Sequence, residues 1–171
     1  MPDWRARLEP RLVAIAAMLA LWVVGIEARL VYLQVFRHAD ASHAAGHPAI
    51  VFRDEAMQLA GRTQAIAWPE LRRQVGAFAA ALDAMGVGPG DRVAAFMPNV
   101  PQTAVAFLAC ASLGAVWSVC SADMGPLAIL DRFRQIEPKV VIGVDGYVYG
   151  GVPADRLPVL RGLIDELPSV R

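Results

Sequence analysis

The stretch that decides the fold is residues 86–99, which read Gly-Val-Gly-Pro-Gly-Asp-Arg-Val-Ala-Ala-Phe-Met-Pro-Asn. Its first half holds three glycines and a proline, a composition that ends a helix and makes a rigid surface turn. Its second half, residues 92–97, is a short, mostly apolar run that stops at Pro98 and predicts a buried strand. The turn therefore separates an upstream helix from a downstream strand, and the chain beyond residue 47 can be placed by reference to it.

The segment before this turn has the spacing of an amphipathic helix. Pro69 is a favoured first helical residue, and apolar residues then recur at steps of four and three: Leu71, Val75, Phe78, Leu82 and Met85. Earlier still, residues 49–53 and 64–67 are predicted to be two short strands of a loose hairpin, with a turn region that begins at residues 54–55. We expect the helical stripe to belong to the core.

The segment after the turn alternates helix and strand. Helices are predicted over residues 101–113, from Pro126 to before Pro138, and over residues 159–167, and strands over residues 116–120 and 140–144. Short buried strands joined by helices of this length are typical of a parallel sheet with right-handed crossovers. The sequence thus predicts an α/β fold, a partial parallel sheet with flanking helices, preceded by an N-terminal hydrophobic helix.

The first 37 residues differ in composition from the rest. Residues 12–26 carry no charge and follow three arginines, and the apolar character resumes over residues 30–36. We interpret residues 1–37 as a signal-anchor-like helix that meets the membrane through residues 12–36, as in a single-pass membrane protein. A cleaved signal peptide and a buried soluble helix are the alternatives.

Residues 28–35, Ala-Arg-Leu-Val-Tyr-Leu-Gln-Val, resemble the segment after the membrane anchor of class B penicillin-binding proteins. The resemblance covers none of that family's catalytic machinery. Arginines on the N-terminal side of an anchor would keep the N-terminus in the cytoplasm and place the remainder outside.

Residues 38–48 contain three histidines, His38, His43 and His47, among Ala, Asp and Gly. We interpret this segment as a solvated linker rather than a metal site.

The formal net charge of the whole chain is zero, with no large basic block, so nucleic acid is a poor candidate partner. Cys110 and Cys120 stand in apolar runs without C-x-x-C spacing, which indicates two small buried thiols.

Several stretches carry a resemblance to one enzyme family. They are Pro-Ala-Ile-Val-Phe at residues 48–52, Trp-Pro-Glu-Leu at 68–71, Gly-Val-Gly-Pro-Gly-Asp-Arg-Val at 86–93, Leu-Gly-Ala-Val-Trp-Ser-Val-Cys-Ser at 113–121 and Phe-Arg-Gln-Ile-Glu-Pro-Lys at 133–139, with Asp-Gly-Tyr at 145–147 and Gly-Gly at 150–151. Together they resemble the AMP-forming acyl-CoA synthetases, and the acetoacetyl-CoA synthetases in particular. The resemblance spans about residues 47–171, and it identifies residues 49–171 as a truncated N-terminal subdomain of such an enzyme.

The resemblance implies that a carboxylic acid, acetoacetate, is activated by ATP with magnesium to an acyl-adenylate and passed to the thiol of coenzyme A. That chemistry needs a Ser/Thr/Gly-rich phosphate loop, an acidic residue for the ribose and a C-terminal domain with a catalytic lysine. The few serines and threonines of these 171 residues are scattered, and no Walker-type loop or G-x-G-x-x-G replaces the phosphate loop. We therefore expect an N-terminal fragment of an acetoacetate–CoA ligase without catalytic residues of its own, inactive alone. Its synthetase-like part is expected in the cytoplasm, where ATP and coenzyme A are plentiful.

One candidate site follows from the same resemblance. The loop around residues 147–152 corresponds to the loop beside the coenzyme A nucleotide, and the residues that carry over are Tyr149, Gly150 and Gly151. Val148 and Val152 stand where relatives more often place Arg and Lys. The alternative is a glycine-rich surface turn after a strand. Asp123 and Met124 are predicted at the carboxyl edge of the sheet, where open α/β sheets bind ligands, but neither residue matches a known role.

Two other classes of function stay open. The chain could be a membrane-tethered, non-catalytic interaction module, or a gene-fusion product without activity. The sheet is also expected to expose an edge beside Val140 and Ile142, which would invite self-association.

Overall fold

The computed structural model describes residues 38–170. By its internal contacts the chain divides into two compact units, residues 1–47 and 48–171, which we describe separately. In the first unit the described part contains helix α2 (His38–Ala44), so the segment predicted to be a linker includes a seven-residue helix. The predicted hydrophobic helix over residues 1–37, with its membrane contact, lies outside the described residues. Within residues 38–170, the helices all fall short of the length and apolar character that crossing a bilayer requires.

The second unit is built on a parallel sheet of three strands, β3 (Arg92–Phe96), β4 (Val116–Cys120) and β5 (Val140–Gly143). Their order is β4-β3-β5, and Val93 is aligned with Trp117 on one side and Val140 on the other. The central strand is the best covered, because its last four residues have no exposed surface. The predicted strands and their parallel pairing are confirmed.

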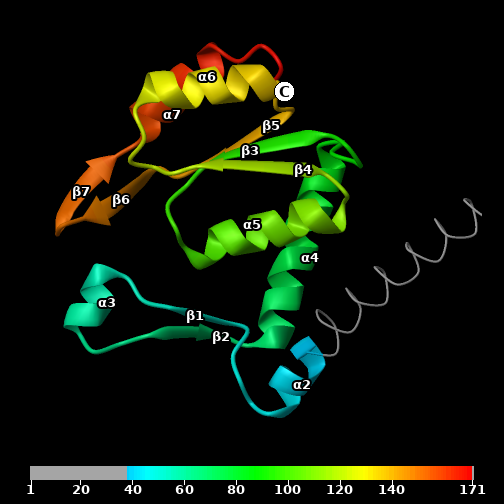
Figure 1. Ribbon diagram of the computed structural model, residues 1–171, viewed down its shortest axis with the longest axis vertical. Coiled ribbons are helices and arrows are strands. Elements are labelled where there is room, and N and C mark those ends of the chain that lie inside the picture. The colour runs from blue at the N-terminus through cyan, green and yellow to red at the C-terminus, as the bar shows by residue number, and fades with distance from the viewer. Residues whose placement is uncertain (1–37, 171) are drawn as a thin grey trace, which may run out of the picture. The chain divides into compact units, whose positions relative to one another are not determined.

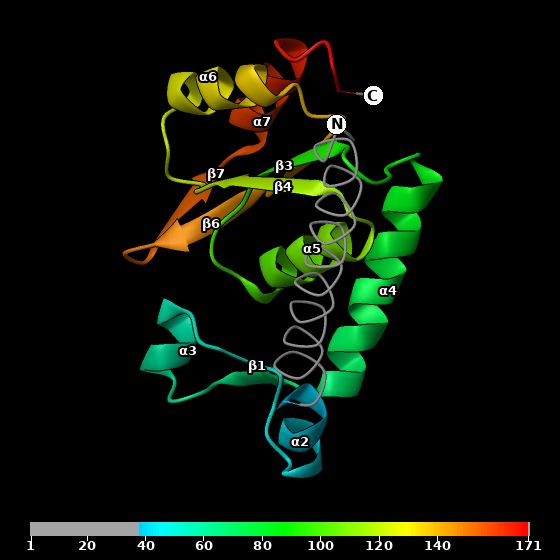
Figure 2. The same cartoon turned by 45° about the vertical axis from the view of Figure 1, so that its right-hand side comes forward.

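Four helices cover the two faces of this sheet (Figure 1, Figure 2): α4 (Trp68–Ala84), α5 (Pro101–Ser112), α6 (Pro126–Ile136) and α7 (Leu157–Asp165). Each has a proline in its first two positions, which fixes the backbone of the first turn without losing a hydrogen bond. On one face Val93 packs among residues of α4 and α5, and on the other Phe96 packs against α6 and α7. Successive residues of β3 thus feed two separate cores.

The turn at residues 86–91 closes the amino edge of the sheet. Asp91 accepts a hydrogen bond from the backbone N–H of Gly88 at 2.9 Å and one from Lys139 Nζ at 2.8 Å, and Lys139 also donates to the carbonyl oxygen of Gly86. The bond from Lys139, followed by the one from Gly88, holds the pKa of the Asp91 carboxyl below its usual range. These contacts join the end of α4, the start of β3 and the start of β5, so the Gly-Pro-Gly-Asp motif has a structural role.

A first hairpin pairs β1 (Ile50–Phe52) with β2 (Gln64–Ile66) in antiparallel fashion, as predicted. The predicted turn between them contains a short helix, α3 (Glu55–Leu59), whose N-cap Asp54 accepts a hydrogen bond from the N–H of Met57 at 2.7 Å. No residue of α3 is buried.

A second hairpin was not predicted. Strands β6 (Gly146–Tyr149) and β7 (Val152–Asp155) pair antiparallel around a two-residue loop. The sequence predicts a loop beside coenzyme A or, as the alternative, a glycine-rich surface turn, because a proline in the second strand and the glycines obscure the strand pattern. The turn itself is present, and tertiary pairing adds the strands.

As expected, the strand that holds Val140 and Ile142, β5, is an outer strand of the three-stranded sheet. The Val140 side chain itself is only 9% exposed and packs in the core with Ile142 beside it. Helix α4 lies on that face. The apolar side chains that are exposed belong instead to the other outer strand, β4, where Val116 is 52% and Val119 is 45% exposed.

Candidate functional site

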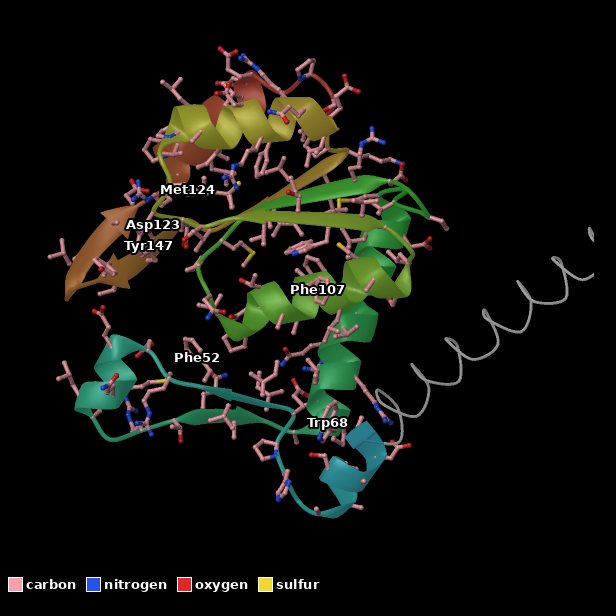
Figure 3. All side chains as sticks on the ribbon, viewed as in Figure 1. Phe52, Trp68, Phe107, Asp123, Met124 and Tyr147 are labelled. Atoms are coloured by element: carbon pink, nitrogen blue, oxygen red, sulfur yellow. The ribbon has the colours of Figure 1, made fainter. Side chains whose placement is uncertain are left out.

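The carboxyl edge of the sheet collects several polar groups. Asp123 and Met124 follow the end of β4, as predicted, and Tyr147 comes from β6 (Figure 3). Met124 and Tyr147 pack against the same core cluster, which places the hairpin beside the loop after β4. The start of α7 adds Arg156, which sequence reasoning missed because nothing around it marks a site.

Arg156, which follows β7, contacts the opposite strand of the second hairpin. Its Nη2 donates to the Tyr147 hydroxyl at 2.9 Å, and its guanidinium carbon lies 5.2 Å from the centre of the Tyr147 ring, within cation–π range. Its backbone N–H donates to the carbonyl oxygen of Asp145 at 2.7 Å. The Nε atom of Arg156 is buried and has no hydrogen-bond partner among the described residues. One donor of this guanidinium is therefore left unmatched at the edge of the sheet.

Asp123 is the anionic member of this group. A hydrogen bond from the Ser121 side chain is the main cause that lowers the pKa of the Asp123 carboxyl, and the charge of Arg156 contributes to the same direction. The nearby Cys120 thiol is buried, and burial raises its pKa, which disfavours the nucleophilic thiolate. The edge thus offers a carboxylate, a guanidinium and a phenol, which suit binding rather than covalent catalysis.

The tip of the second hairpin holds the three residues predicted to contact coenzyme A. Gly150 and Gly151 form the loop with φ of +59° and +76°, the left-handed conformation that a tight two-residue hairpin loop requires. Their two backbone N–H groups donate to the two carboxylate oxygens of Glu55, at 3.1 Å each. Tyr149 is 75% exposed and stands outside this contact. Gly150 and Gly151 therefore both bind one anion, the carboxylate of Glu55. Sequence reasoning did not identify Glu55 as their partner.

The surroundings of the hairpin are open. A hollow of about 500 Å³ lies along it, lined among others by Tyr147, Val148, Pro153 and Leu157. Positions 148 and 152, on either side of the loop, hold exposed valines, and neither side chain can supply a cation. Residues 38–170 hold no group of three or more His, Cys, Asp or Glu side chains placed to bind a metal ion. The three histidines of residues 38–47 therefore do not form such a cluster within the described part.

Three kinds of comparison with known proteins, by family model, by sequence and by structure, point to the same family. The family model described as AMP-binding enzyme matches residues 36–168. The acetoacetyl-coenzyme A synthetase of Rhizobium meliloti (strain 1021) is 49% identical over 119 residues, which are 70% of this chain and 18% of that protein. The acetoacetyl-CoA synthetase of Mus musculus is 38% identical over 144 residues, 84% of this chain and 20% of that protein.

A solved structure shows the same likeness. The acetoacetyl-CoA synthetase from Streptomyces lividans superposes with a TM-score of 0.72 at 44% identity, over 79% of this chain and 21% of that one. The chain thus spans about a fifth of the length of the relatives it matches. The family model covers well over half of the chain, and the hairpin and three-stranded sheet lie within the matched residues. The chain therefore belongs to the family of AMP-binding enzymes, and the three relatives compared above are acetoacetyl-CoA synthetases.

Proposed function

We propose that these residues serve as the N-terminal section of an acetoacetate–CoA ligase, which activates acetoacetate with ATP and magnesium and transfers the acyl group to coenzyme A. The observation that carries the proposal is the likeness to the Streptomyces lividans synthetase, because sequence identity and fold agree over the same region. A family name alone would leave the acid open, since fold does not fix function.

Within such a ligase, the second hairpin is the part that meets coenzyme A. The phosphate groups of coenzyme A need cations or backbone N–H donors. Gly150 and Gly151 carry two such donors at an exposed tip, where the carboxylate of Glu55 accepts both of them in this structure. Tyr149 beside them is exposed, so its ring is available to a nucleotide. The binding of coenzyme A by Tyr149, Gly150 and Gly151 is thus a contact made mainly by backbone.

The adenylating step belongs to the rest of the enzyme. In such reactions most of the acceleration comes from positioned phosphate ligands, and the 171 residues offer only scattered serines and threonines for that purpose. We therefore expect the chain on its own to form no acyl-adenylate.

A chimera tests this proposal. Residues 48–170 would replace the corresponding segment of the Streptomyces lividans synthetase, with the unmodified enzyme and the isolated chain measured in parallel. Release of pyrophosphate from ATP and magnesium should depend on acetoacetate in the chimera and stay at the blank level for the isolated chain. A correctly folded chimera without pyrophosphate release would refute the proposed function. Steady release by the isolated chain would refute the assignment of adenylation to the rest of the enzyme.

A further inference from the structure

The contact between Glu55 and the second hairpin joins two segments that are far apart in sequence. The residues involved are 95 and 96 positions apart, and Figure 2 shows α3 next to the β6–β7 hairpin. Each of the two N–H groups of the loop donates a hydrogen bond to a different carboxylate oxygen of Glu55, and both donor–acceptor distances are 3.1 Å. We call these two hydrogen bonds the Glu55 bridge.

We call the first hairpin, residues 50–66, the flap. The Glu55 bridge holds the tip of the flap, where α3 lies. Helix α3 buries none of its residues, and Leu59 at its end is 91% exposed. The other hydrogen bonds that the structure describes for residues 54–62 stay within that stretch. The base of the flap is packed, because Ile66 is buried in a cluster with Leu71 and Val105. In α3, by contrast, Met57 is half-buried and the other four residues are exposed. An element attached at its base and by two exposed hydrogen bonds at its tip opens at low cost.

We propose that Glu55 is an intramolecular competitor for an anion site at the β6–β7 loop, so that a phosphate-bearing ligand binds Gly150 and Gly151 only when the flap has released them. The inference deepens the proposed function and rests on it for the nature of the ligand, the phosphate groups of coenzyme A. The loop is suited to an anion because two consecutive left-handed residues aim their N–H groups at one point. The carboxylate of Glu55 already occupies that point.

Competition follows from the geometry. Each glycine has one N–H group, and both are taken by Glu55, so a phosphate must displace the carboxylate and cannot bind beside it. A bound carboxylate would also repel a phosphate. Apart from each glycine and its chain neighbours, no described atom lies within 4 Å of the position that a Cβ would take at Gly150 or Gly151, so the loop is open on that side. If the bridge is closed nine-tenths of the time, the apparent dissociation constant for phosphate rises about tenfold.

The experiment follows the two N–H groups directly. The full chain would be labelled with ¹⁵N-glycine, which gives signals from 14 glycines, and Gly150→Asn and Gly151→Asn would identify the two of interest. Asparagine tolerates the left-handed conformation, so these variants keep the loop. Inorganic phosphate is then titrated into the native chain and into Glu55→Gln, which removes the charge and one of the two acceptor oxygens. We expect the Gly150 and Gly151 signals to move at about tenfold lower phosphate in Glu55→Gln.

Two further variants make the result decisive. Glu166→Gln removes the same charge from an exposed glutamate that pairs with Arg134 instead, and it should titrate like the native chain. Glu55→Asp keeps the charge but is too short to reach both N–H groups, so it should behave like Glu55→Gln. Equal phosphate dependence in the native chain and in both Glu55 variants would overturn the competition. An absence of any response in every variant would overturn the anion site. Either outcome is independent of pyrophosphate release by the chimera, which tests the proposed function.

Discussion

Ile129 lies on the inner face of α6 with none of its side chain exposed, whereas Leu127, two residues earlier on the same helix, is 78% exposed. Both side chains have four carbons, and replacing either by alanine removes three of them. Ile129→Ala and Leu127→Ala thus form a matched pair that differs in burial and little else.

The expected cost of Ile129→Ala can be worked out from its position. Removing three buried carbons loses about 2.4 kcal/mol of transfer free energy, at roughly 0.8 kcal/mol for each. Ile129 packs in a cluster with Phe96 and Phe133, both without exposed surface, so the space left behind closes only in part. The cavity adds to the loss, and the total should be about 3–4 kcal/mol. That is a large share of the roughly 5–15 kcal/mol that stabilises a domain.

Urea unfolding followed by circular dichroism measures this difference. With a denaturant slope of about 1.5–2 kcal/mol per molar, the midpoint of Ile129→Ala should fall by about 2 M at unchanged slope. Leu127→Ala should stay within about 0.5 kcal/mol of the native chain. Equal losses for the two variants, or a loss below about 1 kcal/mol for Ile129→Ala, would show that α6 does not pack on the sheet through this face.

Three further predictions address other parts of the chain. Lys139 and a backbone N–H lower the pKa of Asp91 in the folded chain. The stabilisation that ionised Asp91 gives the fold is therefore present above the unfolded pKa of about 3.9 and is lost as pH falls through the folded pKa. The melting temperatures of Asp91→Asn and the native chain should differ at pH 7 and converge in acid. A pH-independent difference would contradict this. A Cβ at Gly146 would lie 2.8 Å from a backbone carbonyl oxygen of β7, so Gly146→Ala should speed hydrogen exchange in the second hairpin. The control, Gly76→Ala, has open space in α4 and should leave this exchange unchanged. Hydrogen-exchange protection that Gly146→Ala does not alter would argue against the pairing of β6 with β7. We also propose that the N-terminal segment binds membranes, so the full chain should sediment with lipid vesicles and a chain without residues 1–40 should not, with equal sedimentation as the contrary result.

The sheet and its helices could be predicted because their signals are local. A proline opens each of α5 and α6, and Gly114 follows the end of α5 in the left-handed conformation that stops a helix. The order of the strands in the sheet, β4-β3-β5, has no local sequence signal, because it depends on how the crossover helices pack. The burial of the Val140 side chain has no local signal either, because the cover from α4 is set by tertiary packing.

The candidate site was only half accessible from the sequence. Resemblance indicated Gly150 and Gly151, and the structure brings them together in one loop with a pair of aligned donors. The partner, Glu55, lies 95 residues from Gly150, in a helix where the sequence predicts a turn, so no spacing rule could connect them. Arg156 was missed for a similar reason, because its contacts with Tyr147 arise only when β6 and β7 pair.

The coenzyme A dependence of the chimera tests the central claim most directly. The hairpin of this chain offers backbone donors at its tip but valines at positions 148 and 152. The chimera should therefore form acetoacetyl-CoA with a KM for coenzyme A above that of the Streptomyces lividans enzyme, and Val148→Arg with Val152→Lys should lower that KM with little effect on pyrophosphate release. A KM for coenzyme A that is unchanged both in the chimera and in the doubly substituted chimera would contradict the placement of coenzyme A at this hairpin.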